Sequence, residues 1–329
     1  MKRPTISVII PAYNVGQYIE AALDSLNDQQ SLPDEVIIID DGSVDDTLRI
    51  IREFDHAYPV SIQSTVNQGQ GAARNLGVSL AKGDYIYFFD SDDMVKPDFI
   101  SDIRDLIAEQ EMPDIIFFSG KCLYETEWID EKSLGYDRGF HGRFNNSVEL
   151  LESFSSRGVI SPMPCLYITK KSLWVDHDLE FIDYYHEDEH ILFPLIFSAK
   201  SYYVTDMVYF IRRVRNGSTM TQQKTVKHVL GLRATVCSLI SMNNSIADRN
   251  LRKFVSWRAL HFLKRYICLC RLTEVSCDKA MLFSAFVALR SPRVPMYSLY
   301  YSSSGQVRNT IKRMLGAGEN FKKTRKHPL

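Results

Sequence analysis

Two short acidic motifs hold the residues best suited to chemistry in this 329-residue chain. Asp40-Asp41-Gly42-Ser43 and Asp90-Ser91-Asp92-Asp93 each begin at the end of an apolar run. Carboxylates about 4 Å apart repel by about 4 kcal/mol per pair at an effective dielectric constant of ~20. A hard divalent cation removes that repulsion, because Mg²⁺ prefers one or two carboxylates together with phosphate oxygens and water. The motifs therefore predict a site for a divalent cation.

Each motif also has a plainer interpretation. Asp40-Asp41-Gly42-Ser43 fits a turn followed by a helix cap, and Asp90-Ser91-Asp92-Asp93 fits a turn before the helix that Pro97 begins. Their occurrence at two corresponding strand ends favours a shared site. The segment Gly69–Arg74 resembles a dinucleotide fingerprint, but it lacks the third glycine and follows the third strand, so no nicotinamide cofactor is expected.

The elements that must position these motifs are buried strands alternating with helices. Continuous apolar runs predict strands, and apolar residues at helical spacing predict helices between them. The expected strands cover 6–10, 36–40, 60–64, 85–89 and 114–119, and the expected helices cover 16–27, 44–54, 70–81 and 97–110. Such repetition predicts an α/β fold with a mostly parallel sheet flanked by helices. Ligands of such sheets bind beyond the carboxyl ends of the strands, where both acidic motifs fall.

The rest of the chain divides into three regions. Residues 121–160 lose the alternating pattern and read as loops that cover one face. Residues 165–215 contain further strand candidates (CLYIT, YYVTD and VYFIR) around a helix that starts near Glu187. Residues 221–329 are basic and helical. We therefore expect a catalytic domain over 1–220 and a smaller basic α-helical domain over 221–329.

Charge is distributed unevenly between these domains. Residues 1–220 contain 19 Lys and Arg and 36 Asp and Glu, whereas residues 221–329 contain 20 Lys and Arg and four acidic residues. An acidic module needs a cation to bind an anionic substrate, and a basic module attracts anionic surfaces. No nucleic-acid recognition motif accompanies the basic charge, so nucleic acid is not expected as a partner.

Composition excludes several protein classes. With 45% hydrophobic and 24% charged residues, the chain is neither disordered nor fibrous. Its six cysteines form no CxxC pair, which argues for idle thiols in a reducing compartment. No apolar run approaches the ~20 residues of a membrane helix, and the short apolar stretch near the start reads as a strand. We expect a cytoplasmic protein, with possible peripheral attachment to the inner leaflet of the cell membrane.

Five motifs in register resemble family 2 glycosyltransferases with the A-type (GT-A, Rossmann-like) fold. They are SVIIPAYN, IIIDDGSVDDT, NQGQGAARNLG, AKGDYIYFFDSDD and HEDE. With RRVRNGSTM added, the resemblance covers about two thirds of the chain, and residues 221–329 match nothing in it. It implies a nucleotide-sugar donor, most often UDP-linked, and Mg²⁺ or Mn²⁺ at the DxD motif.

The resemblance also implies roles for the donor-binding residues. Asp41 matches the aspartate that hydrogen-bonds the base, and the backbone of Pro11, Ala12 and Tyr13 lines the same pocket. Asp90 is implied at the ribose and Asp92 on the metal, with Asp90 and Asp93 as further possible ligands. Arg74 is a candidate for diphosphate or base contact, or a surface arginine paired with a carboxylate.

For the acceptor side, the resemblance implies that Asp188 is the catalytic base. An acceptor hydroxyl is a poor nucleophile, and a single base on the face opposite the leaving group gives one displacement with inversion. Glu187 is interpreted as orienting the acceptor or a nearby loop, and Glu189 as complementing a helix dipole. His186 and His190 flank the base as pocket or surface residues. Arg213 and Arg215 either clamp the diphosphate or remain solvated.

The sequence thus predicts an inverting, metal-dependent glycosyltransferase. Its expected acceptor is a hydroxyl of a glycan or of a lipid-diphosphate-linked acceptor in bacterial surface polysaccharide synthesis, such as O-antigen, capsule or exopolysaccharide. Alternatives are a GDP-sugar or another donor, or a catalytically silent nucleotide-sugar-binding protein. Residues 221–329 either bind an anionic membrane surface or only pack on the catalytic domain. Donor sugar, acceptor and oligomeric state are not fixed by any motif.

Overall fold

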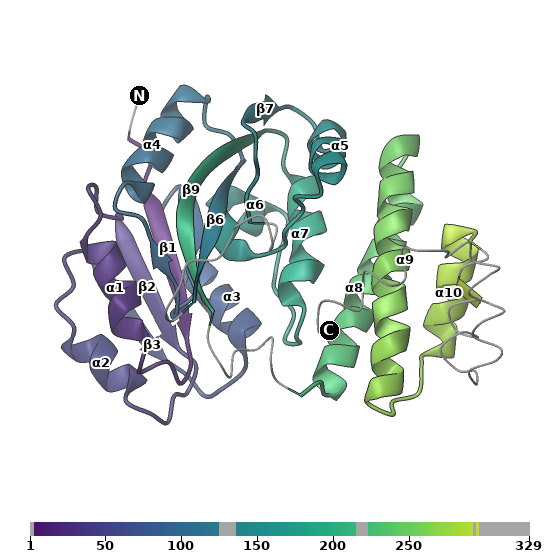
Figure 1. Ribbon diagram of the computed structural model, residues 1–329, viewed down its shortest axis with the longest axis horizontal. Coiled ribbons are helices and arrows are strands. Elements are labelled where there is room, and N and C mark those ends of the chain that lie inside the picture. The colour runs from purple at the N-terminus through teal and green to yellow at the C-terminus, as the bar shows by residue number, and fades with distance from the viewer. Residues whose placement is uncertain (1–2, 125–135, 215–222, 292–293, 296–329) are drawn as a thin grey trace. The chain divides into compact units, whose positions relative to one another are not determined.

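The computed structural model describes residues 3–124, 136–214, 223–291 and 294–295 (Figure 1). The chain divides into two compact units. Unit 1 comprises Met1–Asp183 and Glu187–Gln222, and unit 2 comprises Tyr184–His186 and Gln223–Leu329. The chain therefore leaves unit 1 for three residues just before Glu187 and then returns to it.

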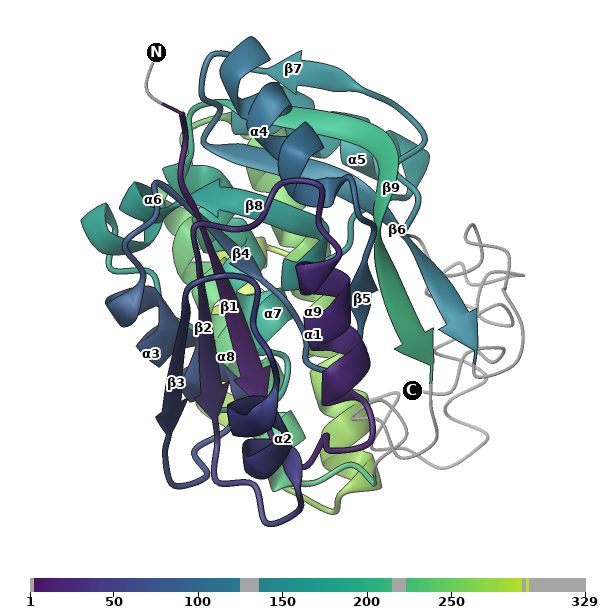
Figure 2. The same ribbon diagram turned by 90° about the vertical axis from the view of Figure 1, so that its left-hand side faces the viewer.

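Unit 1 is built on a sheet of nine described strands in the order β3-β2-β1-β4-β8-β6-β9-β5, with β7 paired to β9. The strands are β1 (Ile6–Ala12), β2 (Glu35–Asp40), β3 (Val60–Ser64), β4 (Tyr85–Phe88), β5 (Met94–Val95), β6 (Ile115–Tyr124), β7 (Gly142–Phe144), β8 (Tyr167–Lys170) and β9 (Tyr202–Val214). β3, β2, β1 and β4 are parallel, as the arrows of β1–β3 show in Figure 2. β8 is antiparallel to both β4 and β6. The expected α/β class is confirmed, and the sheet becomes mixed beyond β4.

Helices cover both faces of this sheet. They are α1 (Ile19–Asn27), α2 (Thr47–Glu53), α3 (Gln70–Leu80), α4 (Phe99–Glu109), α5 (Ser147–Arg157), α6 (Lys171–Asp176) and α7 (Glu187–Ser198). Both views place α1 and α4 on one face and α3 and α7 on the other (Figures 1 and 2). Ile6, Val8 and Ile10 of β1 belong to the buried core, and the intervening Ile9 lies against Gly77 of α3. Burial on both faces explains why the strands read as continuous apolar runs.

The expectation that residues 121–160 lose the strand–helix pattern is wrong for the described residues 121–124 and 136–160. β6 continues to Tyr124, and α5 forms because Asn146 accepts a hydrogen bond from the Glu149 N–H (2.9 Å) and Gly158 ends the helix with φ +70°. A side-chain N-cap and a left-handed glycine are strong local helix signals. The segments YYVTD and VYFIR, expected as separate strands, form the single strand β9.

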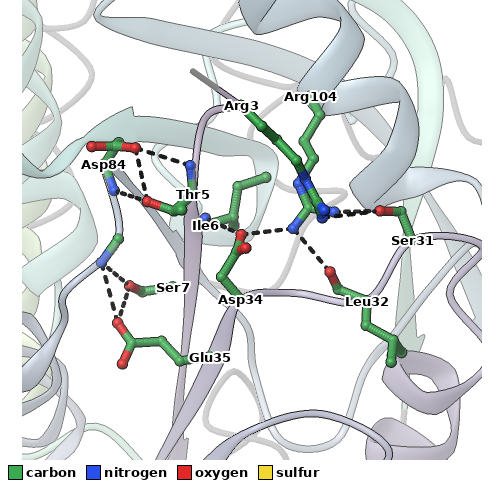
Figure 3. Close-up of polar contacts among 11 residues, drawn as sticks. Arg3, Thr5, Ile6, Ser7, Ser31, Leu32, Asp34, Glu35, Asp84 and Arg104 are labelled. Carbon is green, nitrogen blue, oxygen red and sulfur yellow. Dashed lines mark hydrogen bonds and ion pairs between the residues drawn. The ribbon is translucent and has the colours of Figure 1, made fainter.

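The amino ends of the strands form an edge where each acidic side chain has local donors (Figure 3). In this amino edge (residues 3–7, 31–35 and 82–84), Asp84 accepts from the N–H and hydroxyl of Thr5 (3.0 and 2.8 Å). Asp34 accepts from the Ile6 N–H (2.8 Å) and pairs with Arg104 (2.6 Å). These bonds fix the start of β1 to its neighbours.

Unit 2 is helical over its described residues, with α8 (Val226–Ser245), α9 (Arg249–Leu272) and α10 (Lys279–Leu289). α8 buries residues at helical spacing, among them Leu232, Val236 and Leu239, and α9 buries Phe262, Leu263 and others. Asp248 and Asp278 cap α9 and α10 by accepting backbone N–H bonds. None of the described helices has the length and hydropathy needed to cross a bilayer.

Candidate active site at the carboxyl edge of the sheet

The loops that follow β1, β2 and β3 are tied together by short polar contacts. Asp41 is buried, and its two carboxylate oxygens accept the backbone N–H groups of Gln68 and Gly69, both at 2.8 Å. Asn14, after β1, accepts from the Val44 N–H at 2.9 Å. Asp41 thus fixes the loop that enters α3.

Of the residues expected beside this loop, Pro11 and Ala12 are buried at the end of β1. Tyr13 is 47% exposed, which leaves its ring available to a ligand.

The acidic loop after β4 contains the closest grouping of potential metal ligands among the described residues. Asp90, Asp93 and Cys165 each place one ligand atom within 4.8 Å of the others. Asp93 is buried and accepts the Arg213 N–H at 2.7 Å, yet burial and the neighbouring Asp92 and Asp90 hold its pKa well above the usual range. Asp92 precedes it in the same loop and is half-buried.

The donor set of this cluster fits a divalent cation. Two carboxylates supply the hard oxygen ligands that Mg²⁺ and Mn²⁺ prefer, and Asp92 lies one residue away. Cys165 is fully buried, and burial together with Asp90 and Asp93 raises its pKa. No sequence signal identified this cysteine, since it lies on the segment before β8 and reaches the site only through the fold.

Arg213, at the end of β9, contacts the acidic loop from the other side. Its N–H binds the Asp93 carboxylate and its Nε donates to the Asp92 carbonyl at 3.2 Å. Its guanidinium carbon lies 5.5 Å from the centre of the Tyr18 ring. Arg215, the other expected clamp, lies outside the described residues.

Arg74 links the acidic loop to the segment that carries the predicted base. Its side chain is 2% exposed and pairs with Asp90 (2.9 Å) and with Glu187 (3.0 Å). Burial alone would lower the pKa of this guanidinium, but the two carboxylates more than offset that effect and raise it. Its Cζ also lies 5.2 Å from the Phe181 ring centre. Arg74 is therefore a buried, doubly paired cation, not a surface arginine.

The predicted base lies in the first turn of α7. Asp188 Oδ1 accepts the Glu189 N–H at 2.7 Å. Burial, followed by repulsion from Glu187 and Glu189, raises the pKa of Asp188 to about 8. Such a carboxylate is a far stronger base than an exposed aspartate. Glu187, Asp188 and Glu189 also complement the positive end of the helix.

The two histidines beside the base have different surroundings. His186 belongs to unit 2, whereas His190 belongs to unit 1, where burial lowers its pKa. The structure therefore brings Asp90, Arg74 and Glu187 into direct contact and separates the flanking histidines into different units.

The fold is the GT-A fold, which the solved structures compared below share. Residues 7–158 match the family described as Glycosyl transferase family 2. The match covers the loops after β1, β2 and β4, including Asp41 and the Asp90–Asp93 motif.

Among similar proteins, the putative glycosyltransferase EpsH of Bacillus subtilis is 35% identical over 133 residues, which are 40% of this chain and 36% of EpsH. Chondroitin synthase of Escherichia coli is 40% identical over 124 residues, covering 37% of this chain and 17% of that protein. The chain thus spans well under half the length of these curated relatives. Glycosyltransferase GlyG of Streptococcus pneumoniae is 25% identical over 268 residues, covering 73% and 83% of the two chains.

Among solved structures, S. aureus TarS 1–349 in complex with UDP-GlcNAc superposes with a TM-score of 0.65 at 19% identity. The match covers 90% of this chain and 84% of that one. At this identity the likeness shows a shared fold.

Proposed function

We propose that this chain transfers a sugar from a UDP-sugar to a hydroxyl of a glycan or lipid-linked acceptor in bacterial surface polysaccharide synthesis, with inversion. The observation that carries the proposal is Arg74, which joins the acidic loop of the DxD motif to the segment of the predicted base. Donor chemistry and proton removal then share one site. The relatives that make polysaccharides and the UDP-GlcNAc complex of TarS support the choice of reaction and donor.

In this mechanism, Asp92 would hold Mg²⁺ or Mn²⁺, with Asp90 and Asp93 as further ligands, and the bound cation would supply positive charge beside the diphosphate leaving group. Asp41 keeps the loop before α3 in place for the nucleotide base. Arg213 faces the acidic loop, where a guanidinium can bind diphosphate oxygens. Asp188 accepts the proton of the acceptor hydroxyl, and Arg74 keeps Glu187 beside it.

Thermal shift with UDP and GDP, each with and without Mn²⁺, tests this function. We expect UDP to raise Tm only when Mn²⁺ is present. The variant Asp92→Asn should lose that shift, whereas Asp105→Asn, which changes an exposed carboxylate on α4, should keep it.

Thermal shift together with an assay for nucleotide release separates the alternative functions. A rise in Tm with GDP but not with UDP would assign a GDP-sugar donor. Nucleotide binding without release of UDP or GDP from any of a panel of UDP- and GDP-sugars would favour a silent binding protein. The absence of any shift would overturn the proposal.

We further propose that residues 221–329 bind an anionic membrane surface. Over the described part, α10 exposes Phe283, Phe286 and Val287 between Lys279 and Arg290. Exposed aromatic groups flanked by cations suit an anionic lipid surface. Co-sedimentation with phosphatidylglycerol vesicles should fall steeply between 50 and 500 mM salt, with little binding to phosphatidylcholine. Added salt shortens the Debye length, which is ~10 Å at 0.1 M, and so screens the attraction between the basic residues and the anionic lipid. Absent or salt-insensitive binding would leave packing on the catalytic domain as the role of the basic residues.

A further inference from the structure

The segment that delivers the predicted base to its site is held from two sides. Residues 181–186, here termed the approach segment, form the last part of the connection between α6 and α7 and end immediately before Glu187 and Asp188. Its first residues belong to unit 1 and its last three, Tyr184–His186, belong to unit 2. The two halves can therefore be considered separately.

The first half is fixed to α3. The Asn75 side chain donates to the Phe181 carbonyl (2.8 Å) and accepts the Phe181 N–H (2.9 Å). A Cβ atom on Gly71 would lie 2.4 Å from the Ile182 carbonyl oxygen. The backbone of the approach segment thus lies directly on the backbone of α3, the helix that also carries Arg74.

The second half makes the same type of contact with α8 inside unit 2. A Cβ atom on Gly231 would lie 1.7 Å from the Tyr185 carbonyl oxygen and 2.9 Å from its carbon. One turn earlier on the same helix face, the His228 ring stacks on the Tyr185 ring, with centroids 3.8 Å apart and planes at 13°. Only glycine at position 231 leaves room for this backbone.

His228 is itself held in place. Its Nδ1 accepts the Thr225 N–H at 3.1 Å in the capping box that starts α8, and the residue is 2% exposed. Burial, with smaller effects from Lys224 and His186, lowers its pKa to about 4. The ring that supports Tyr185 is therefore neutral and fixed in orientation at physiological pH.

Only a short stretch of chain separates Tyr185, which α8 holds in place, from the predicted base. Asp188 follows Tyr185 by three residues, and each step between Cα atoms spans about 3.8 Å. His186 adopts a left-handed backbone with φ +72°, a conformation that is uncommon outside glycine. Glu187 is already paired to Arg74. A shift of Tyr185 would therefore be passed on to the first turn of α7.

We propose that Gly231 and His228 of α8 are positioning residues for Asp188, so that the helical unit sets the geometry of proton removal in the transfer reaction. This inference rests on the proposed function. It gives residues 223–245 a task in catalysis that is separate from any contact with donor, acceptor or membrane.

The central variant is Gly231→Ala, which places a methyl group where the Tyr185 carbonyl now lies. A misplacement of about 1 Å can reduce a rate by about 10²-fold. We expect kcat for release of UDP or GDP to fall about 10- to 100-fold with the best donor of the sugar-nucleotide panel. The Kd for the corresponding nucleotide with Mn²⁺, measured by calorimetry, should change by less than about twofold, since the donor loops are untouched.

Two further variants separate the ring contact from folding. His228→Phe keeps a flat ring against Tyr185 and should retain most of kcat, whereas His228→Ala removes the ring and should lower kcat. Gly83→Ala is the matched steric control, because its Cβ would lie 2.5 Å from the Ser7 hydroxyl at the amino edge. It should lower Tm without a selective loss of kcat.

The outcomes distinguish the inference from the proposed function. A folded Gly231→Ala protein with the kcat of the unmodified chain would overturn the inference, as would parallel loss of kcat and nucleotide binding. Equal kcat for the Phe and Ala variants at position 228 would overturn the role of the ring. If the unmodified chain neither binds a nucleotide nor releases one from any donor, the proposed function fails first and the inference fails with it.

Discussion

Acidic side chains have opposite surroundings at the amino and carboxyl edges of the unit 1 sheet. At the amino edge, Asp34 and Asp84 each accept several donors. Asp114, before β6, is similar: burial acts to raise its pKa, but Lys170 and backbone N–H groups lower it overall. At the carboxyl edge, Asp93 and Asp188 have raised pKa values because burial and neighbouring carboxylates dominate. These undercompensated carboxylates are the groups to which the proposed function assigns the cation and the proton, because strongly shifted pKa values cluster at functional sites.

The largest expected effect at the carboxyl edge is loss of the base. Asp188→Asn should reduce kcat about 10³-fold, because general-base catalysis contributes about 10²- to 10⁴-fold. UDP binding with Mn²⁺ should be retained, as measured by calorimetry. A variant with normal kcat would show that another group accepts the proton.

The pH dependence should reveal the same group. Only deprotonated Asp188 can accept a proton, so kcat/KM should rise as the pH approaches about 8 and level off above it. Well below that pKa the rise is about tenfold per pH unit, and because half of the Asp188 groups are still protonated at pH 8, the total rise between pH 6 and 8 is about 50-fold. Initial rates in a constant-ionic-strength buffer series measure this profile. A profile that is flat from pH 6 to 9 would contradict the role of a carboxylate with this raised pKa.

Removal of the Arg74 guanidinium at the carboxyl edge should lower the free energy of unfolding of unit 1. Arg74→Met leaves Asp90 and Glu187 facing each other without a guanidinium, and breaking a buried ion pair from one side costs about 3 kcal/mol or more. The free energy of unfolding from urea titration measures this. The control is Arg49→Met, whose partners Asp46 and Glu53 are exposed, so it should change stability by less than about 1 kcal/mol.

The smallest effect should come from the amino edge and should spare activity. Arg104→Met removes the partner of Asp34, which remains 30% exposed, so we expect a loss of about 1–2 kcal/mol in the free energy of unfolding. The value of kcat/KM should stay within twofold. A fall in kcat/KM of more than twofold in the folded Arg104→Met protein would show that the amino edge also affects activity and would contradict the distinction between the two edges.

Local sequence signals predicted the parts of this molecule that depend on local rules. The runs around Val8, Ile38 and Tyr87 specified buried strands, since strands covered on both faces cannot alternate with polar residues. The acidic motifs then followed the strand ends that a parallel sheet brings together. α5 was missed although Asn146 and Gly158 mark its ends, because its low apolar content hid the helical period.

Long-range contacts account for what the sequence did not predict. Cys165 joins Asp90 and Asp93 only because the segment before β8 returns to the sheet beside β4. The contacts of Asn75 with Phe181, and of Gly231 with Tyr185, join residues with no common periodicity. No pattern within a single element carries that information.

The ion pair between Arg74 and Glu187 also has a consequence for how the chain folds. Its partners are 113 residues apart, so forming it requires closure of a long loop of chain. Because the entropy of closing such a loop must be offset before the contact forms, we expect this pair to form after the local helices and neighbouring strands. During synthesis the parallel strands can assemble while residue 187 has not yet left the ribosome. Under the proposed function, appearance of transferase activity would then report that this long-range closure of unit 1 is complete.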